Sequence, residues 1–325
     1  MNKASKAVLI YYKIMDYQPE NLQLLDKAFN VTTLPDPTHD TPQTLKEAEV
    51  ILAPLGYYVG QAKIDGSPKL KVIGSNTTGH PHIDVDYARK KGIRVVTLKE
   101  EHAFLKTITP TAELTWGLII ALTRNILPAC LAVKDGQWDR RPFGGPSMLS
   151  RMKLGVAGYG RLGKMVASYG ICFGMKVIYY DPFVDCSEPG IDRANSLEEL
   201  VSSVDIVTIH IPHEPETEGL FSKKIFTAFK KGYFLVNTAR GELVDQDALF
   251  ACLNNGTLAG AAIDVLEGEF VSGFDTAIRQ NSLWQYAQNN DNLIITPHIG
   301  GSTKDAWRLT EAHTIESILR VLNNG

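Results

Sequence analysis

Three glycines in a G-x-G-x-x-G spacing, Gly158, Gly160 and Gly163, constrain the fold of this 325-residue chain more than any other feature. The apolar run 154–157 before them predicts a strand, and residues 161–173 after them predict a helix. In that setting the first glycine permits a tight turn, the second lets the backbone approach a pyrophosphate, and the third lets the helix lie close to the strand. The N–H groups of the helix N-terminus favour an anion. The motif therefore predicts a dinucleotide site.

The predicted strand 176–181 ends in Asp181, roughly twenty residues after the glycines. A carboxylate at this place accepts hydrogen bonds from the adenosine ribose hydroxyls and repels a 2′-phosphate, which favours NAD over NADP. Asp181 is also a suitable turn residue before Pro182. Arg161 could still bind the 2′-phosphate of NADP, so the sequence does not exclude that cofactor.

Strand and helix signals alternate in two series. In the first hundred residues, short apolar runs predict strands at 7–12, 31–34, 50–55, 71–75 and 93–98, with helices at 20–29 and 84–91 between them. One long helix, 109–130, separates them from a second series of six strands that starts at 153. This alternation predicts parallel α/β sheets. A last helix, 303–322, is expected to return to the first domain.

Composition excludes several classes of protein. A formal net charge of −3 provides no basic field for nucleic acid or an anionic membrane. Arg124, Asn125 and Pro128 interrupt the longest apolar stretch, 114–133, and the N-terminus is not typical of a signal peptide. No zinc-type spacing occurs, so no metal site is expected. The four cysteines, Cys130, Cys172, Cys186 and Cys252, are predicted to be reduced core residues of a cytoplasmic protein.

Three polar residues, Arg240, Glu269 and His298, each follow one of the later predicted strands. The carboxyl ends of parallel strands form the ligand crevice of such sheets, so these residues are expected to converge beside a nicotinamide. A guanidinium matches a carboxylate and polarises a carbonyl, and an imidazole exchanges the hydroxyl proton. A carboxylate on the far imidazole nitrogen favours the protonated ring and fixes it. The set predicts redox chemistry between a 2-hydroxy acid and a 2-keto acid.

These features together resemble the D-isomer-specific 2-hydroxyacid dehydrogenases, which include phosphoglycerate, glycerate and D-lactate dehydrogenases. Five segments carry the resemblance in order: TPTAELTWGLIIALTRNI, GVAGYGRLGKMVA, VNTARGELVDQDAL, AAIDVLEGE and TPHIGGST. The resemblance implies an α/β fold in which a Rossmann dinucleotide-binding domain, 107–298, is inserted in a flavodoxin-like α/β substrate domain, 1–106 and 299–325. It also implies a homodimer that pairs through the long helix and its flanking loop.

The resemblance also implies residue roles. Arg161 and Leu162 would meet the pyrophosphate and Asp181 the ribose, and Ile211 and Pro212 would line the path from adenine to the nicotinamide ribose. Thr238 and Ala239 would contact the nicotinamide end, and Asp264 its carboxamide. The complete implied cofactor set is Gly158, Gly160, Arg161, Leu162, Gly163, Asp181, His210, Ile211, Pro212, Thr238, Ala239, Asp264 and Gly300. Thr78, Gly79 and His80 would bind the substrate together with Arg240.

Some positions depart from the family pattern. Phe270 follows Glu269 where proline is common, and the long segment 271–291 comes next, either as a helix over the cleft or as a surface elaboration. His80 and His82 both lie in the predicted substrate loop. His82 is expected to have a structural role rather than to contact the substrate. These departures leave the acid substrate undetermined. An NAD-sensing co-repressor-like binding protein, or a dehydrogenase of another small anion such as formate or phosphite, remains an alternative.

Overall fold

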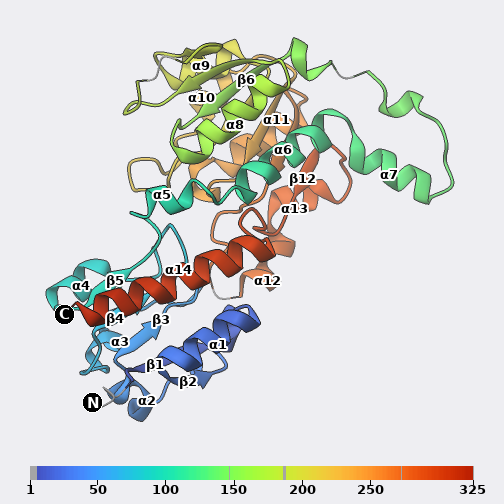
Figure 1. Cartoon of the computed structure of the whole chain (residues 1–325). Coiled ribbons are helices and arrows are strands. Elements are labelled where there is room, and N and C mark those ends of the chain that lie inside the picture. The colour runs from blue at the N-terminus through green and yellow to red at the C-terminus, as the bar shows by residue number, and fades with distance from the viewer. Residues whose placement is uncertain (1–5, 146, 186–187, 272, 325) are drawn as a thin grey trace. The chain divides into compact units, whose positions relative to one another are not determined.

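A computed structural model describes residues 6–145, 147–185, 188–271 and 273–324 of the chain (Figure 1). Its contacts divide the chain into two compact units. The first comprises Met1–Ile108 and Ser302–Gly325, and the second comprises Thr109–Gly301. The first unit is thus built from both ends of the sequence, and the second is a continuous insertion between them.

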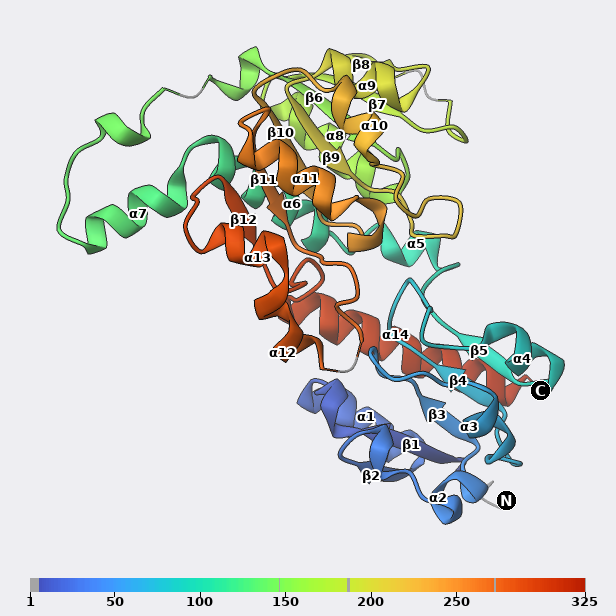
Figure 2. The ribbon, with the colours of Figure 1, turned by 180° about the vertical axis from the view of Figure 1, so that it is seen from behind.

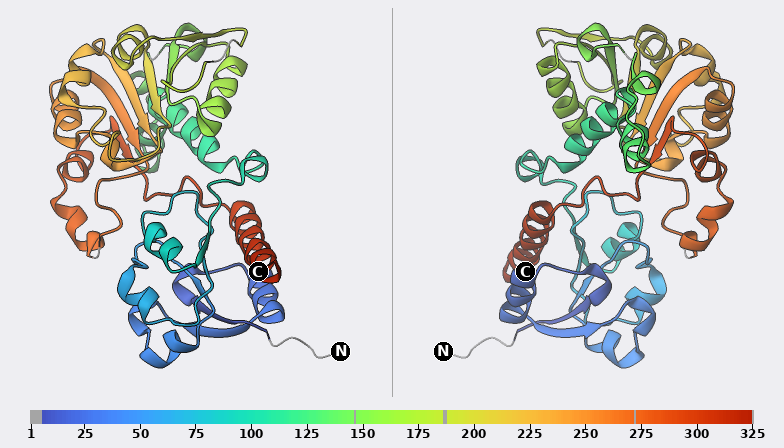
Figure 3. Two further views of the ribbon diagram at one scale, coloured as in Figure 1. Left: turned by 90° about the vertical axis from the view of Figure 1, so that its left-hand side faces the viewer. Right: turned by 90° about the vertical axis from the view of Figure 1, so that its right-hand side faces the viewer.

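The first unit is a five-stranded parallel sheet in the order β2-β1-β3-β4-β5. Its strands are β1 (Val8–Tyr12), β2 (Asn30–Leu34), β3 (Val50–Leu52), β4 (Val72–Gly74) and β5 (Arg94–Val96). Its helices are α1 (Pro19–Ala28), α2 (Pro42–Glu47), α3 (Gln61–Asp65), α4 (Val85–Lys90), α5 (His102–Leu105) and α14 (Lys304–Asn323). The C-terminal α14 lies beside α1 and packs on β4 (Figure 3), where Ile315 and Ile318 are fully buried. The last helix therefore completes the core of the N-terminal sheet.

The second unit is a seven-stranded parallel sheet in the order β12-β11-β10-β9-β6-β7-β8. Its strands are β6 (Lys153–Ala157), β7 (Lys176–Tyr180), β8 (Ile191–Arg193), β9 (Ile206–Ile209), β10 (Tyr233–Asn237), β11 (Leu258–Ile263) and β12 (Leu293–Ile295). Helices α6 (Pro110–Thr123) and α8 (Arg161–Cys172) pack on one face. The helices α9 (Leu197–Ser203), α10 (Lys223–Ala228), α11 (Gln246–Asn254) and α13 (Ser282–Ala287) pack on the other (Figure 2).

The predicted parallel α/β architecture is confirmed, but two element predictions were wrong. The second sheet has a seventh strand, β8, which the hydrophobic pattern missed because it is short and half polar at the sheet edge. The single helix predicted over 109–130 is two helices, α6 and α7 (Ile126–Lys134). Asn125 between them has a left-handed backbone, φ +53°, which ends the α6 ladder.

The cysteine prediction was wrong in part. Cys130 and Cys172 are exposed and Cys252 is half-buried, so the first two are not core residues. Both lie on helices whose apolar neighbours gave the appearance of a core pattern. Cys186 lies outside the described residues.

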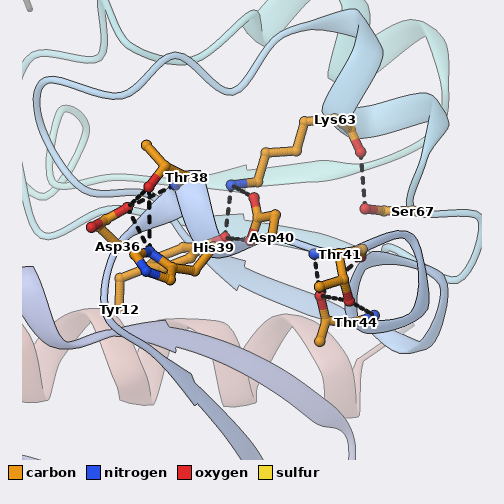
Figure 4. Close-up of polar contacts among 9 residues, drawn as sticks. All are labelled: Tyr12, Asp36, Thr38, His39, Asp40, Thr41, Thr44, Lys63 and Ser67. Carbon is orange, nitrogen blue, oxygen red and sulfur yellow. Dashed lines mark hydrogen bonds and ion pairs between the residues drawn. The ribbon is translucent and has the colours of Figure 1, made fainter.

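A buried polar triad ties α3 to the end of β1 (Figure 4). The Lys63 ammonium lies 2.7 Å from the Asp40 carboxylate and donates a 2.7 Å hydrogen bond to the Tyr12 hydroxyl, which itself donates to Asp40 at 2.8 Å. Burial lowers the pKa of Lys63 and raises the pKa of Tyr12. Because both charges are almost completely removed from water, each depends on the other for compensation.

We expect Asp40→Asn and Lys63→Met each to lower the free energy of unfolding by about 3 kcal/mol, because each leaves one buried charge unpaired. The double variant should lose clearly less than the sum of the two. Urea unfolding followed by circular dichroism measures these differences. Lys69→Met, which removes an exposed pair with Glu47, is the matched control and should cost less than about 1 kcal/mol. Strictly additive losses would show that the triad is not a coupled unit.

Candidate active site

The glycine loop joins β6 to the N-terminus of α8 at the carboxyl edge of the second sheet. Gly158 has φ +89°, and a Cβ there would lie 2.6 Å from the His210 carbonyl oxygen. A Cβ on Gly163, within α8, would lie 2.0 Å from the Gly158 carbonyl oxygen. The space at Gly160, the N-cap of α8, is open. The loop is therefore closed on the protein side and open at the helix N-terminus, as an anionic ligand requires.

Asp181 follows β7 and is buried. One carboxylate oxygen accepts a 2.8 Å hydrogen bond from the Tyr159 N–H, within the glycine loop. The other accepts hydrogen bonds from the Phe183 and Val184 N–H groups, at 2.8 and 3.1 Å. The carboxylate thus fixes the glycine loop to the end of the neighbouring strand, in addition to the ribose contact that the sequence predicts.

Most of the other predicted cofactor residues lie along the same edge of this sheet. His210 follows β9, and burial lowers its pKa to about 3, so its ring is neutral. Its Nε2 lies 2.9 Å from the Thr208 hydroxyl. Thr238, after β10, shares a 2.8 Å hydrogen bond with Thr115 of α6. Half-buried Ile211 and exposed Pro212 continue from His210, and Arg161 and Leu162 form the first turn of α8.

The imidazole of His298 and the carboxylate of Glu269 meet directly. Nδ1 of His298 lies 2.6 Å from Oε1 of Glu269, although 28 residues separate them in the sequence. Glu269 is 11% exposed and His298 31% exposed. Nε2 of His298 forms no hydrogen bond with any described residue. The pair is thus an imidazole held at one nitrogen, with its other nitrogen available for a proton transfer.

The backbone at His298 is strained. Its φ of +51° is rare for a residue with a side chain. Asp264, 1% exposed at the end of β11, holds this turn. Its carboxylate accepts from the N–H groups of Ile299 and Gly300 and from the Thr296 hydroxyl, and its carbonyl accepts from the His298 N–H.

Arg240 is half-buried after β10, and its Nη1 donates to the Ala239 carbonyl at 2.6 Å. Among the described residues, no hydrogen bond or ion pair joins it to the Glu269–His298 pair. The backbones of the two segments nevertheless touch, because a Cβ on Gly241 would lie 2.1 Å from the Leu266 carbonyl carbon. The structure therefore brings two of the three predicted catalytic side chains together and places the third on an adjoining loop.

The predicted substrate loop belongs to the first unit. The Thr77 hydroxyl donates to the Gly79 carbonyl at 2.6 Å, and Ser75 lies between Thr77 and the Nε2 of His82. His82 is buried, and burial lowers its pKa to about 4. Thr78 is exposed, and Gly79 and His80 are half-buried. His82 thus supports the loop from inside.

A model of the family described as D-isomer specific 2-hydroxyacid dehydrogenase, NAD binding domain, matches residues 116–300. The chain belongs to this family. The resemblance seen in the sequence is therefore confirmed, and the second unit carries the NAD-binding domain. The open cradle at Gly160, with the N-terminus of the 12-residue helix α8 behind it, fits a dinucleotide.

Relatives and solved structures agree with this placement. The chain is 35% identical over 283 residues to the D-3-phosphoglycerate dehydrogenase of Methanocaldococcus jannaschii, covering 86% of this chain and 51% of the relative. It is 36% identical over 254 residues to that of Bacillus subtilis, covering 77% and 45%. The chain spans about half the length of the curated relatives it matches. A D-lactate dehydrogenase from Aquifex aeolicus, complexed with NAD and lactic acid, superposes with a TM-score of 0.82 at 29% identity, covering 98% of this chain and 96% of that one.

Sequence reasoning missed three features of the site. The hydrogen bonds of Asp264 to the histidine turn, the contact of Gly241 with the glutamate segment and the ring of Phe270 beside His298 were not predicted. The last had a visible signal, since Phe270 departs from the family pattern. The segment 271–291 contains α12 (Phe274–Ala277) and α13, and Tyr286 of α13 packs on Phe250 of α11.

We expect Asp264→Asn to destabilise the second unit by about 1–3 kcal/mol, because an amide NH₂ in place of one oxygen faces a backbone N–H and leaves it unpaired. Thr296→Val, which removes a single hydroxyl donor to the same carboxylate, is the milder matched variant. Urea unfolding gives the stabilities, and amide hydrogen exchange at Ile299 and Gly300 reports the turn. Unchanged exchange in Asp264→Asn would contradict the anchoring role.

Proposed function

We propose that this chain is an NAD-dependent oxidoreductase that interconverts a D-2-hydroxy acid and its 2-keto acid. The observation that supports it most is the 2.6 Å contact between Glu269 and His298 at the carboxyl edge of the NAD-binding domain. An acid/base pair at that edge lies where ligands of parallel α/β sheets bind. A small 2-hydroxy or 2-keto acid fits the family to which the chain belongs.

In the proposed reaction the cofactor, when bound, supplies or accepts the hydride. During reduction, His298 donates the proton from Nε2 to the keto oxygen, which becomes the hydroxyl of the product. Glu269 holds the ring by Nδ1 and compensates the imidazolium charge before that transfer. Arg240 binds the carboxylate of the acid and polarises its carbonyl.

The cofactor contacts are proposed as the sequence assigns them. The phosphates lie on the N-terminus of α8 at Gly160, Arg161 and Leu162, and the ribose lies at Asp181. The nicotinamide end lies at Thr238 and Ala239, and its carboxamide at Asp264. The carboxylate of Asp181 favours NAD over NADP, since a 2′-phosphate would be repelled there.

We expect His298→Ala to lower kcat by about a thousandfold with NADH binding unchanged, because it removes the proton donor and leaves the glycine loop intact. A panel of 2-keto acids with NADH and with NADPH, followed by nicotinamide absorbance, measures turnover, cofactor choice and substrate size.

The control is His102→Ala, which removes an exposed imidazole of the first unit. It should leave turnover within about twofold, as most exposed substitutions do. Undiminished turnover in His298→Ala would remove His298 from the mechanism. NADH binding without turnover of any acid would favour the NAD-sensing binding protein, and turnover of formate or phosphite alone would favour the other alternative.

We also propose that the chain pairs with a second copy through α7 and the loop that follows it. Helix α7 has no buried residue, although it is rich in leucine, isoleucine and valine. Exposed apolar side chains continue along this arm, with Trp138 90% exposed. The set is Ile126, Leu127, Leu131, Val133, Trp138 and Met148. An apolar patch of this kind on one segment marks an interface, and an identical chain is the occupant typical of such dehydrogenases.

We expect the double variant Leu131→Glu/Val133→Glu to convert a dimer into a monomer, because it places four charges in a two-fold interface. Light scattering after size exclusion should give twice the 35.8 kDa chain mass for the unmodified protein and the single mass for the variant. Ile14→Glu, at an exposed apolar residue of the first unit, is the control. A variant that remains dimeric would place the interface elsewhere.

No single helix of the described residues is long and apolar enough to cross a membrane, although the bent pair His102–Thr123 and Ile126–Lys134 meets the criteria of length and composition. The proposal includes a cytoplasmic location. It includes no nucleic-acid or membrane partner, which the net charge of −3 supports.

A further inference from the structure

The ring of Phe270 lies against the imidazole of His298. The two ring centroids are 5.4 Å apart and the planes are tilted by 53°. Phe270 directly follows Glu269. The carboxylate and the phenyl ring that contact the imidazole therefore come from consecutive residues of one turn. Phe270 is 36% exposed and is not among the buried core residues of this unit, so its ring is a partly exposed neighbour of the imidazole.

A tight turn holds the backbone that carries this ring. Gly268 has φ +74°, and its carbonyl accepts a 2.9 Å hydrogen bond from the Val271 N–H, which closes a turn around Glu269 and Phe270. The Phe274 N–H donates to the Val271 carbonyl at the start of α12. The carboxylate that bonds the imidazole and the phenyl that covers it are therefore presented by the same tight turn.

The centroid separation lies in the range of favourable aromatic pairs, and the tilt is between the stacked and the edge-to-face arrangements. A neighbouring apolar ring also lowers the local dielectric around the imidazole, and a hydrogen bond is stronger where the local dielectric is low. Both effects favour an imidazole that keeps its orientation and its Nδ1 proton. A proline at this position has no aromatic ring to provide either effect.

We propose that Phe270 is a positioning residue for the acid/base pair: its ring orients the His298 imidazole and shields the Nδ1 hydrogen bond to Glu269 from water. This inference rests on the proposed dehydrogenase function, because the Glu269–His298 pair transfers a proton only in that reaction. Phe270 acts through His298 and has no assigned contact with substrate or cofactor.

The first test needs no turnover. In protein with ¹⁵N-labelled histidine, the Nδ1 proton of His298 should give a low-field signal that exchanges slowly with water. We expect Phe270→Ala to speed this exchange about threefold to tenfold, the range that corresponds to the loss of one aromatic contact. Phe270→Tyr, which keeps the ring, should restore slow exchange. Val271→Ala, an exposed neighbour in the same turn, is the matched control and should exchange as the unmodified protein does.

The second test is kinetic. Phe270→Ala should lower kcat for keto-acid reduction by a similar factor and leave the KM for NADH within about twofold, and Phe270→Tyr should recover kcat. Unchanged exchange in Phe270→Ala, or equal acceleration in Val271→Ala, overturns the positioning role. If the unmodified protein reduces no acid, the proposed function fails, while the exchange measurement still decides whether Phe270 shields the pair.

Discussion

The carboxylate of Asp264 is the constraint on which the candidate site depends. A left-handed backbone at His298 costs about 1–2 kcal/mol. Four hydrogen bonds that end on Asp264 stabilise this turn: one comes from the His298 N–H, and three come from the neighbouring residues 296, 299 and 300. Because Asp264 is buried directly after β11, the position of the imidazole is set by the core of the second sheet. Glu269 then meets Nδ1 from a turn that follows the same strand a few residues later.

The strand-end loops reach this arrangement by very close backbone approach. Gly241, after Arg240, leaves room for the Leu266 carbonyl, where any side chain would collide. The Glu242 side chain then accepts from the Gly268 N–H at 3.4 Å. Arg240 and Glu269 thus extend from loops that are packed on one another, although their side chains make no direct bond among the described residues. Functional residues on such closely packed loops are held by a rigid backbone, so only their side-chain rotamers can change where the functional groups lie.

The sequence predicted the sheets and the glycine loop because each depends on local signals: apolar runs of strand length, and glycines at fixed spacing between a strand and a helix. It failed at the break between α6 and α7, because the left-handed Asn125 interrupts an apolar run that otherwise predicts one helix. It failed at β8, whose three residues carry too little hydrophobic pattern. The Phe270–His298 and Asp264–Gly300 contacts join distant residues, and one sequence alone gives no signal for such pairs.

The polar groups along the carboxyl edge divide into two kinds. Asp181 and Asp264 each accept three hydrogen bonds through their carboxylates, mostly from backbone N–H groups, and so hold loops in place before any ligand arrives. His298 presents Nε2 without a partner, and the neutral His210 has a buried Nδ1 without one, as far as the described residues extend. A carboxylate has about four acceptor sites, so each acid keeps room for one further hydrogen bond, as the proposed ribose and carboxamide contacts require. The two acids therefore preorganise the edge, and His298 keeps the nitrogen that the proposed proton transfer needs.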